Sequence, residues 1–151
     1  MHPFKKGLMG LVIGFGAIAV IKDYACFLYS ETASMPYRYF LNLKKIKPQK
    51  GDYTCLDSPW YGQKIIKEIV GQEGDQIFYD TEGNLWIGPK KIGKPKRKTK
   101  DGRHLHSLQA GAIPKGFVFV TGHHDHSFDS RYQELGLVPL CNLQGRVTGL
   151  L

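Results

Sequence analysis

Residues 64–75 read KIIKEIVGQEGD, a short run rich in isoleucine and valine that ends at a Gly and Asp turn. The period of two that describes a β-strand places Lys67 on the same face as Ile65 and Ile69. Burial on that face would disfavour the ammonium form and lower the lysine pKa, which suits a general base. A lysine at a sheet edge would instead extend its amine into water. The alternation alone leaves both interpretations open.

The remainder of the chain beyond residue 30 has the same strand character. Short runs of β-branched and aromatic residues are separated by Gly, Pro and Asp clusters, which is typical of strands joined by turns. Besides residues 64–70, the expected strands are 37–43, 52–56, 76–80, 85–87, 117–121 and 145–149. No segment in this part keeps a helical period, and no repeat recurs. We therefore expect a mainly β domain over residues 30–151.

An apolar segment precedes this domain. Two lysines, Lys5 and Lys6, stand before residues 7–21, GLMGLVIGFGAIAVI, in which no side chain is polar. At about 1.5 Å per residue this run covers about 22 Å of a roughly 30 Å hydrocarbon layer, so a full span also needs residues 24–29. We expect residues 1–29 to be a signal anchor with one transmembrane helix.

The same segment also fits a removable signal peptide, because Ala17-Ile18-Ala19 has the small-x-small form of a leader cleavage site. In either case the positive-inside rule keeps Lys5 and Lys6 in the cytoplasm and exports the domain after the apolar segment. This predicts a protein of the bacterial inner membrane, crossing it once, with a periplasmic domain.

Positive charge is concentrated in one stretch. The formal net charge is +8, and residues 89–104, PKKIGKPKRKTKDGRH, hold eight Lys or Arg against one acidic residue. Proline and glycine within the run predict a solvated basic loop. Electrostatic docking to phospholipid or nucleic acid is the functional alternative.

The three cysteines, Cys26, Cys55 and Cys141, show none of the Cys-x-x-Cys spacing of a zinc ribbon or a thioredoxin motif. An exported domain permits disulfides, so a bond between Cys55 and Cys141 is an alternative that the sequence leaves open.

A nucleophile candidate lies in residues 32–41, TASMPYRYFL. Pro36 disfavours a helical conformation for Met35, so Ser34 is expected in a rigid, extended or turning segment. A serine hydroxyl needs a base within hydrogen-bond reach before it can attack at neutral pH. Lys67 could supply that base, whereas the ordinary interpretation is a turn serine.

Several segments in order resemble the conserved boxes of signal peptidase I: TASMP (32–36), KGDYTCL (50–56), KIIKEIVGQEGD (64–75), IPKGFVFVTG (113–122) and HSFDSRY…GLVP…GRV (126–147). The small size, SFDSRY and DGRHLH (101–106) look most similar to the TraF-type peptidases of conjugative plasmids, which process pilin precursors. The resemblance implies a signal peptidase-like β domain that is a serine endopeptidase of the S26 type, with Ser34 as nucleophile and Lys67 as general base.

The resemblance also implies supporting roles. Thr32 and the backbone N–H of Ser34 correspond to an oxyanion hole. Ser127 falls where a family serine hydrogen-bonds the lysine, and Asp129 with Arg131 resembles the ion pair that braces the site. A surface turn with an ordinary ion pair is the alternative. The chain departs from the family where Glu68 replaces an arginine that often follows the lysine, and where GHHDH (122–126) replaces Gly-Asp-Asn.

The function predicted in this way is a Ser/Lys endopeptidase that needs no cofactor or metal. It processes exported pilin precursors for conjugative transfer, and cyclisation of the product is one possible outcome. Its expected partners are the precursor and membrane lipids, without nucleic acid. The alternatives are a general leader peptidase, a self-cleaving repressor, and a membrane-anchored binding protein without activity. A further alternative is a metal-dependent hydrolase that uses residues 123–126 with His104 and His106.

Overall fold

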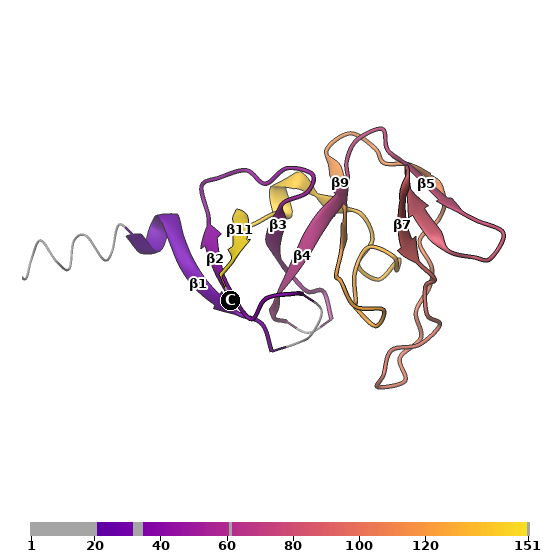
Figure 1. Ribbon diagram of the computed structural model, residues 1–151, viewed down its shortest axis with the longest axis horizontal. Helices are drawn as coiled ribbons and strands as arrows, with labels where there is room; N and C mark the ends of the chain where they lie inside the picture. Colours follow the sequence, from indigo (N-terminus) through magenta and orange to yellow (C-terminus); the bar gives the residue numbers. More distant parts are fainter. Residues whose placement is uncertain (1–20, 32–34, 61, 151) are drawn as a thin grey trace, which may run out of the picture.

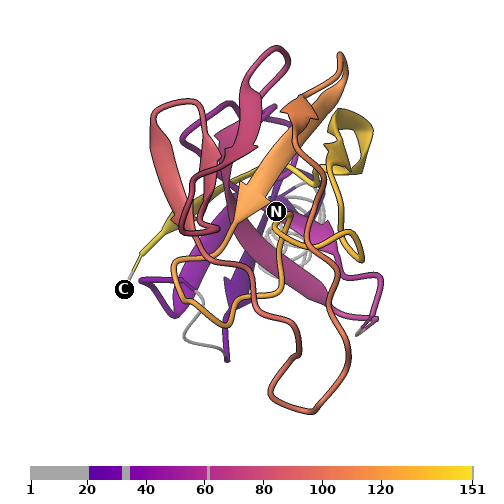
Figure 2. The ribbon, with the colours of Figure 1, turned by 90° about the vertical axis from the view of Figure 1, so that its right-hand side faces the viewer.

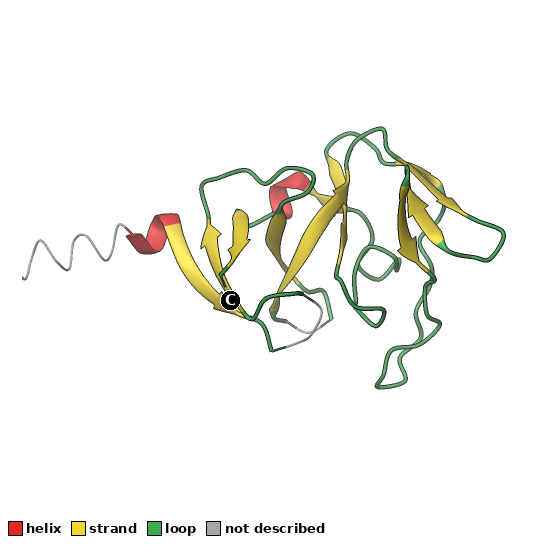
Figure 3. Ribbon diagram, viewed as in Figure 1, coloured by secondary structure: helices red, strands yellow, loops and turns green. Residues whose placement is uncertain are grey.

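The computed structural model describes residues 21–31, 35–60 and 62–150 of the 151-residue chain. These residues form two antiparallel β-sheets that follow one another along the long axis of the molecule (Figure 1). Helical structure in the described part is limited to residues 21–24 and the 3-10 helix η1, Leu140–Asn142 (Figure 3). The mainly β class predicted from the alternating sequence pattern is confirmed.

The larger sheet has seven strands in the order β1-β2-β11-β3-β4-β9-β10. They are β1 (Ala25–Tyr29), β2 (Tyr39–Leu43), β3 (Tyr53–Asp57), β4 (Lys64–Gly71), β9 (Phe117–Thr121), β10 (Val138–Pro139) and β11 (Arg146–Gly149). The smaller sheet has the order β7-β6-β5-β8, with β5 (Gln76–Tyr79), β6 (Leu85–Ile87), β7 (Lys90–Gly93) and β8 (Gly111–Ala112). Each strand expected beyond residue 30 is therefore present, with ends shifted by at most two residues.

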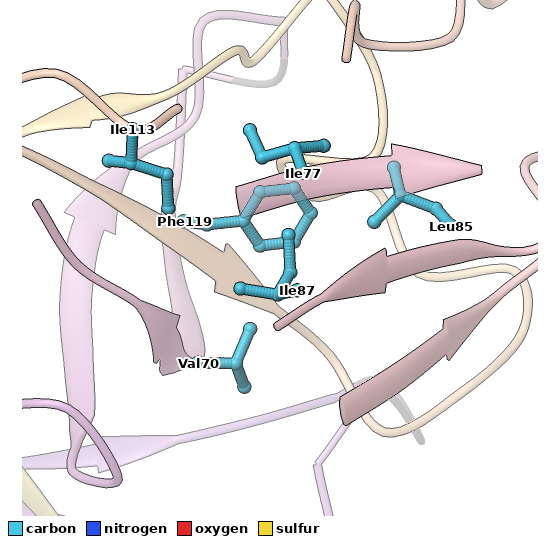
Figure 4. Close-up of a cluster of buried hydrophobic side chains, with 6 residues drawn as sticks. All are labelled: Val70, Ile77, Leu85, Ile87, Ile113 and Phe119. Carbon is cyan, nitrogen blue, oxygen red and sulfur yellow. The ribbon is translucent and has the colours of Figure 1, made fainter. Parts of the chain in front are cut away.

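A cluster of buried apolar side chains joins the two sheets (Figure 4). Val70 and Phe119 come from the larger sheet, while Ile77 and Ile87 come from the smaller one. Gly71 allows this close contact, because a Cβ at that position would lie 2.6 Å from Cδ1 of Ile113. The sheets are thus held together by a dry core rather than by a flexible linker.

Strand β4 takes part in all three buried apolar clusters. Ile66 packs in a cluster with Met35, Ile69 packs in a second cluster with Val120, and Val70 belongs to the cluster between the sheets. Lys67 lies within this run and is only 3% exposed. The strand that decides the fold is therefore also the strand that carries the buried lysine.

The expected boundary of the N-terminal anchor at residue 29 needs correction. Residues 25–29 form β1, which pairs with β2 from Ala25 opposite Leu43 to Tyr29 opposite Tyr39. Alternating exposure along ACFLY suits an edge strand, and the expected sheet begins before residue 30. Among the described residues, no helix has the length and apolar character needed to cross a bilayer. Residues 1–20, which hold most of the apolar run, lie outside the described part.

Two further expectations change in the structure. The basic stretch 89–104 is not loop throughout, because β7 pairs with β6, and its exposed lysines are typical of an edge strand. The three cysteines are free thiols, with Cys55 buried and Cys141 exposed, so the alternative of a bond between them is wrong. Burial in the sheet core raises the pKa of the Cys55 thiol to about 11.

Candidate active site

Lys67 is a buried amine with a specific partner. Its Nζ donates a hydrogen bond to Oγ of Ser127 over 2.7 Å. Desolvation by burial lowers the lysine pKa from 10.5 to about 8; nearby Asp129 opposes this shift, and Arg131 adds to it. The interpretation of Lys67 as a strand-edge residue that reaches water is therefore wrong. With this pKa, about a tenth of the amine is neutral at pH 7, a far larger fraction than at the ordinary lysine value, and only the neutral amine can abstract a proton.

The segment after β9 supplies the groups around this amine. Asp129 and Arg131 form a bidentate ion pair, with Nε to Oδ1 and Nη2 to Oδ2 both at 2.9 Å. The carboxylate is fully buried and also accepts hydrogen bonds from Oγ1 of Thr121 and the backbone N–H of Gly122. A buried charge with this many partners is held in one orientation.

Arg131 also fixes the backbone that carries Ser127. Its Nη2 donates to the carbonyl oxygens of His124 at 3.1 Å and of Ser127 at 3.2 Å. The hydroxyl of Ser130 receives a hydrogen bond from the backbone N–H of Val120. The segment is thereby tied to β9, so the Ser127 hydroxyl has a defined position beside Lys67.

A cleft of about 550 Å³ opens beside the lysine, and we call it the Lys67 cleft. Its floor is formed by residues 64–67 of β4 together with Ser127, and Leu28 and Tyr29 of β1 line its side. The contribution of β1 was not expected from sequence, because residues 24–29 were assigned to the anchor. The sequence ACFLY is apolar throughout and has no polar alternation, so no local signal separated this strand from the anchor.

Ser34 and Thr32, the predicted nucleophile and oxyanion residue, lie outside the described residues. The described residues on either side of them are informative. Glu31 lines the Lys67 cleft, and Met35 is buried in the cluster that contains Ile66, the neighbour of Lys67. Both ends of this short segment are therefore near the lysine.

Glu68, the departure from the family pattern, does not contact Lys67. Its carboxylate forms ion pairs with Nζ of Lys90 at 2.9 Å and with Nε2 of His123 at 2.8 Å. The two segments in which the chain differs from the family pattern are therefore in contact, because His123 belongs to GHHDH (122–126). The contact joins β4 to the segment that holds Ser127.

The histidines expected in the metal alternative have separate partners. His106 pairs with Glu134 at 2.7 Å, His123 with Glu68, and the ring of His124 lies beside that of His126. Within the described ranges, no group of three His, Cys, Asp or Glu side chains is arranged to hold a metal ion.

A buried lysine hydrogen-bonded to a serine beside an open cleft is consistent with peptide-bond hydrolysis, and comparison with known families agrees. Residues 7–151 match the family described as signal peptidase, peptidase S26. The chain belongs to this family. It is therefore a serine peptidase that processes exported precursor proteins, and the predicted resemblance to signal peptidases is confirmed. The family accounts for nearly the whole chain, which leaves no basis for the self-cleaving repressor alternative.

Among solved structures, the peptidase is similar to the crystal structure of a signal peptidase I from Enterococcus faecalis V583. The two share 26% sequence identity, and the alignment covers 68% of this chain and 97% of that chain with a TM-score of 0.45. No curated protein matches the chain.

Proposed function

We propose that this S26 peptidase is a membrane-anchored endopeptidase with a Ser34/Lys67 dyad that matures pilin precursors for conjugative transfer. The dyad is supported by the environment of the Lys67 amine. This amine is buried and donates a hydrogen bond to Ser127, and burial lowers its pKa to about 8. Chain connectivity supports the partner, because Glu31, which precedes Ser34 by three residues, lines the same cleft as Lys67. TraF-type specificity rests on the small size of the chain and on the resemblance of residues 101–106 and 127–132.

The reaction proceeds through an acyl-enzyme. Neutral Lys67 accepts the hydroxyl proton of Ser34 as Oγ attacks the scissile carbonyl, and the resulting oxyanion is bound by Thr32 and the Ser34 N–H. Lys67 then gives that proton to the leaving amine, and the peptide C–N bond breaks. Water attacks the ester with Lys67 again as base, which releases the new carboxylate and restores Ser34. Ser127 orients the amine, and the Asp129–Arg131 pair braces the Ser127 backbone.

The proposed location is the bacterial inner membrane, with the domain from β1 onward in the periplasm. The apolar run 7–21 after Lys5 and Lys6 supports this orientation. An exported, membrane-embedded precursor would then meet the Lys67 cleft at the membrane surface.

The pH dependence of the reaction tests the proposed base. Below the pKa of about 8, each fall of one pH unit should lower kcat/KM about tenfold, because only neutral Lys67 accepts the Ser34 proton. The rate should reach a plateau above about pH 9. The measurement is kcat/KM on a quenched fluorescent peptide between about pH 6 and pH 10. A midpoint near the ordinary lysine value of 10.5, or a flat profile, would contradict the assignment.

Co-expression with candidate pilin precursors tests the substrate and the fate of the acyl-enzyme. A precursor whose own N-terminus lies near the ester can replace water as the acceptor, because a tethered amine has a high effective concentration. We expect a cyclic product, about 18 Da lighter than the linear cleaved chain because no water is added. Intact mass with an inactive Ser34→Ala control distinguishes the outcomes. A linear product alone would indicate an ordinary leader peptidase, and loss of cleavage on chelation would favour the metal-dependent alternative.

A further inference from the structure

Residues 94–104 are the part of the basic stretch that follows β7, and from here on the name basic loop refers to them. They line a further cleft of about 280 Å³, which we call the lysine cleft. Its lining includes Lys96, Lys98 and Lys100 from the basic loop and Phe128 and Tyr132 from the segment after β9. His126, Ser127 and Phe128 line both this cleft and the Lys67 cleft. Both clefts therefore border the segment that contains Ser127, and an extended peptide that crosses this segment contacts both.

The basic loop is held against the domain by specific contacts. The backbone N–H of Lys96 donates to the hydroxyl of Tyr132 at 3.2 Å, and Lys98 forms a β-bridge with His104. The guanidinium of Arg103 lies 5.5 Å from the ring centre of Trp60, which in turn stacks on Phe128 at 4.7 Å. These contacts place the lysine cleft at a fixed position next to Ser127.

The lysine cleft has an excess of positive charge. Asp101, the one carboxylate among its lining residues, is paired with Nε of Arg103 at 3.1 Å. Lys96, Lys98 and Lys100 are exposed, and none has a carboxylate partner among the residues that the structure describes. By contrast, the Lys67 cleft has apolar walls that include Leu28 and Ile65. A ligand that fits both clefts is apolar in one part and anionic in the other.

The position of the basic loop favours a substrate peptide over a membrane surface. Residues 21–24 and β1 lie at one end of the long axis in Figure 1, whereas the basic loop lies below the smaller sheet and projects sideways from that axis. Figure 2 shows the same projection away from both sheets. A peptide bound at Ser127 is adjacent to these lysines, because Ser127 lines both clefts, whereas the loop does not project toward the end at which residues 21–24 lie.

We propose that the lysine cleft binds aspartate or glutamate side chains of the precursor on one side of the scissile bond, and thereby selects acidic substrates. This inference rests on the proposed function, because it assigns a specificity to the same site. Exposed ion pairs are individually weak and are screened by salt, so the selection is a sum of several contacts.

The test uses the full-length peptidase and two sets of quenched peptides with a common cleavage site. One set carries two aspartates before the scissile bond and the other carries them after it, each with a matched asparagine peptide. We expect one of the two sets to be preferred by about tenfold in kcat/KM over its asparagine counterpart at low salt. The triple variant Lys96→Gln, Lys98→Gln, Lys100→Gln should abolish this preference and leave cleavage of the asparagine peptides unchanged.

The matched control variant is Lys45→Gln, Lys47→Gln, Lys115→Gln, which removes the same charge from exposed positions outside the lysine cleft. It should retain the preference. Equal cleavage of aspartate and asparagine peptides by the unmodified enzyme would overturn the inference while leaving the proposed function intact, whereas no cleavage of any peptide would overturn the proposed function itself. Loss of binding to vesicles with anionic lipid in the triple variant, with the peptide preference unchanged, would show that the loop serves the membrane instead.

Discussion

Lys67→Ala and Ser34→Ala should each lower kcat/KM by about 10⁴-fold or more, and the double variant should be about as inactive as either single variant. Residues that act as one catalytic unit lose activity together, because neither the nucleophile without its base nor the base without its nucleophile can form the acyl-enzyme. Removing the Lys67 side chain also removes the donor to Ser127. The measurement is peptide cleavage by purified variants whose folding is checked by circular dichroism.

Lys50→Ala is the matched control for this experiment. Lys50 does not line the Lys67 cleft, and its exposed amine pairs with Asp75. Its loss should leave the rate within about twofold, because an exposed ion pair contributes little. Near-normal turnover in Lys67→Ala would show that the dyad is wrong, whatever Lys50→Ala does.

Arg131→Met should be the most destabilising of the site variants, by about 3–5 kcal/mol in the free energy of unfolding at pH 7. It leaves the fully buried carboxylate of Asp129 without its bidentate partner. It also releases the carbonyl oxygens of His124 and Ser127. Denaturant unfolding measures the loss, and Lys50→Met, which breaks the more exposed Lys50–Asp75 pair, should cost about 0–1 kcal/mol.

The same variant has a kinetic signature. Burial lowers the pKa of Lys67 most, Asp129 raises it and Arg131 lowers it, so removal of the guanidinium removes one of the two effects that lower the pKa. The midpoint of the pH profile should therefore move above about 8 in any fraction that stays folded. Removing both charges, as Asp129→Leu with Arg131→Met, should destabilise less than Arg131→Met alone, because no unpaired charge remains buried. A double variant that is less stable than the single one would contradict this account.

Some features of this site were predicted from the local alternation of residues, and others only from the family resemblance. Alternation along residues 64–70 correctly predicted β4 and the shared face of Lys67 and Ile69, because side chains two residues apart in a strand point the same way. It did not predict that the opposite face, with Ile66 and Val70, is buried as well. The same rule could not separate a buried amine from one that reaches water, since that depends on Ser127 and Asp129, about 60 residues away in sequence. These contacts were suggested only by the family resemblance.

Four strands of the described part were missed: β8 and β10, which have two residues each, and the longer β1 and β7. The two longer strands were missed for opposite reasons. In β1 the apolar composition continues that of the preceding segment, so composition concealed an edge strand. In β7 the density of lysines indicated a solvated loop, although exposed lysines are also common on edge strands. Local sequence favours neither interpretation, and pairing with β2 and β6 decides each case.

The participation of β4 in all three buried clusters has a consequence for cooperativity. Separation of any one cluster from the others exposes apolar surface on the strand that the remaining two require. The backbone amides of residues 66–70 should therefore exchange with deuterated solvent only when the whole domain opens, and they should be the slowest in the chain. A partly unfolded form that keeps the lysine in place is then not available to this peptidase. Its activity should be lost in the same unfolding transition as its structure. The lifetime of the enzyme in the cell is then set by global unfolding rather than by local unfolding at the site.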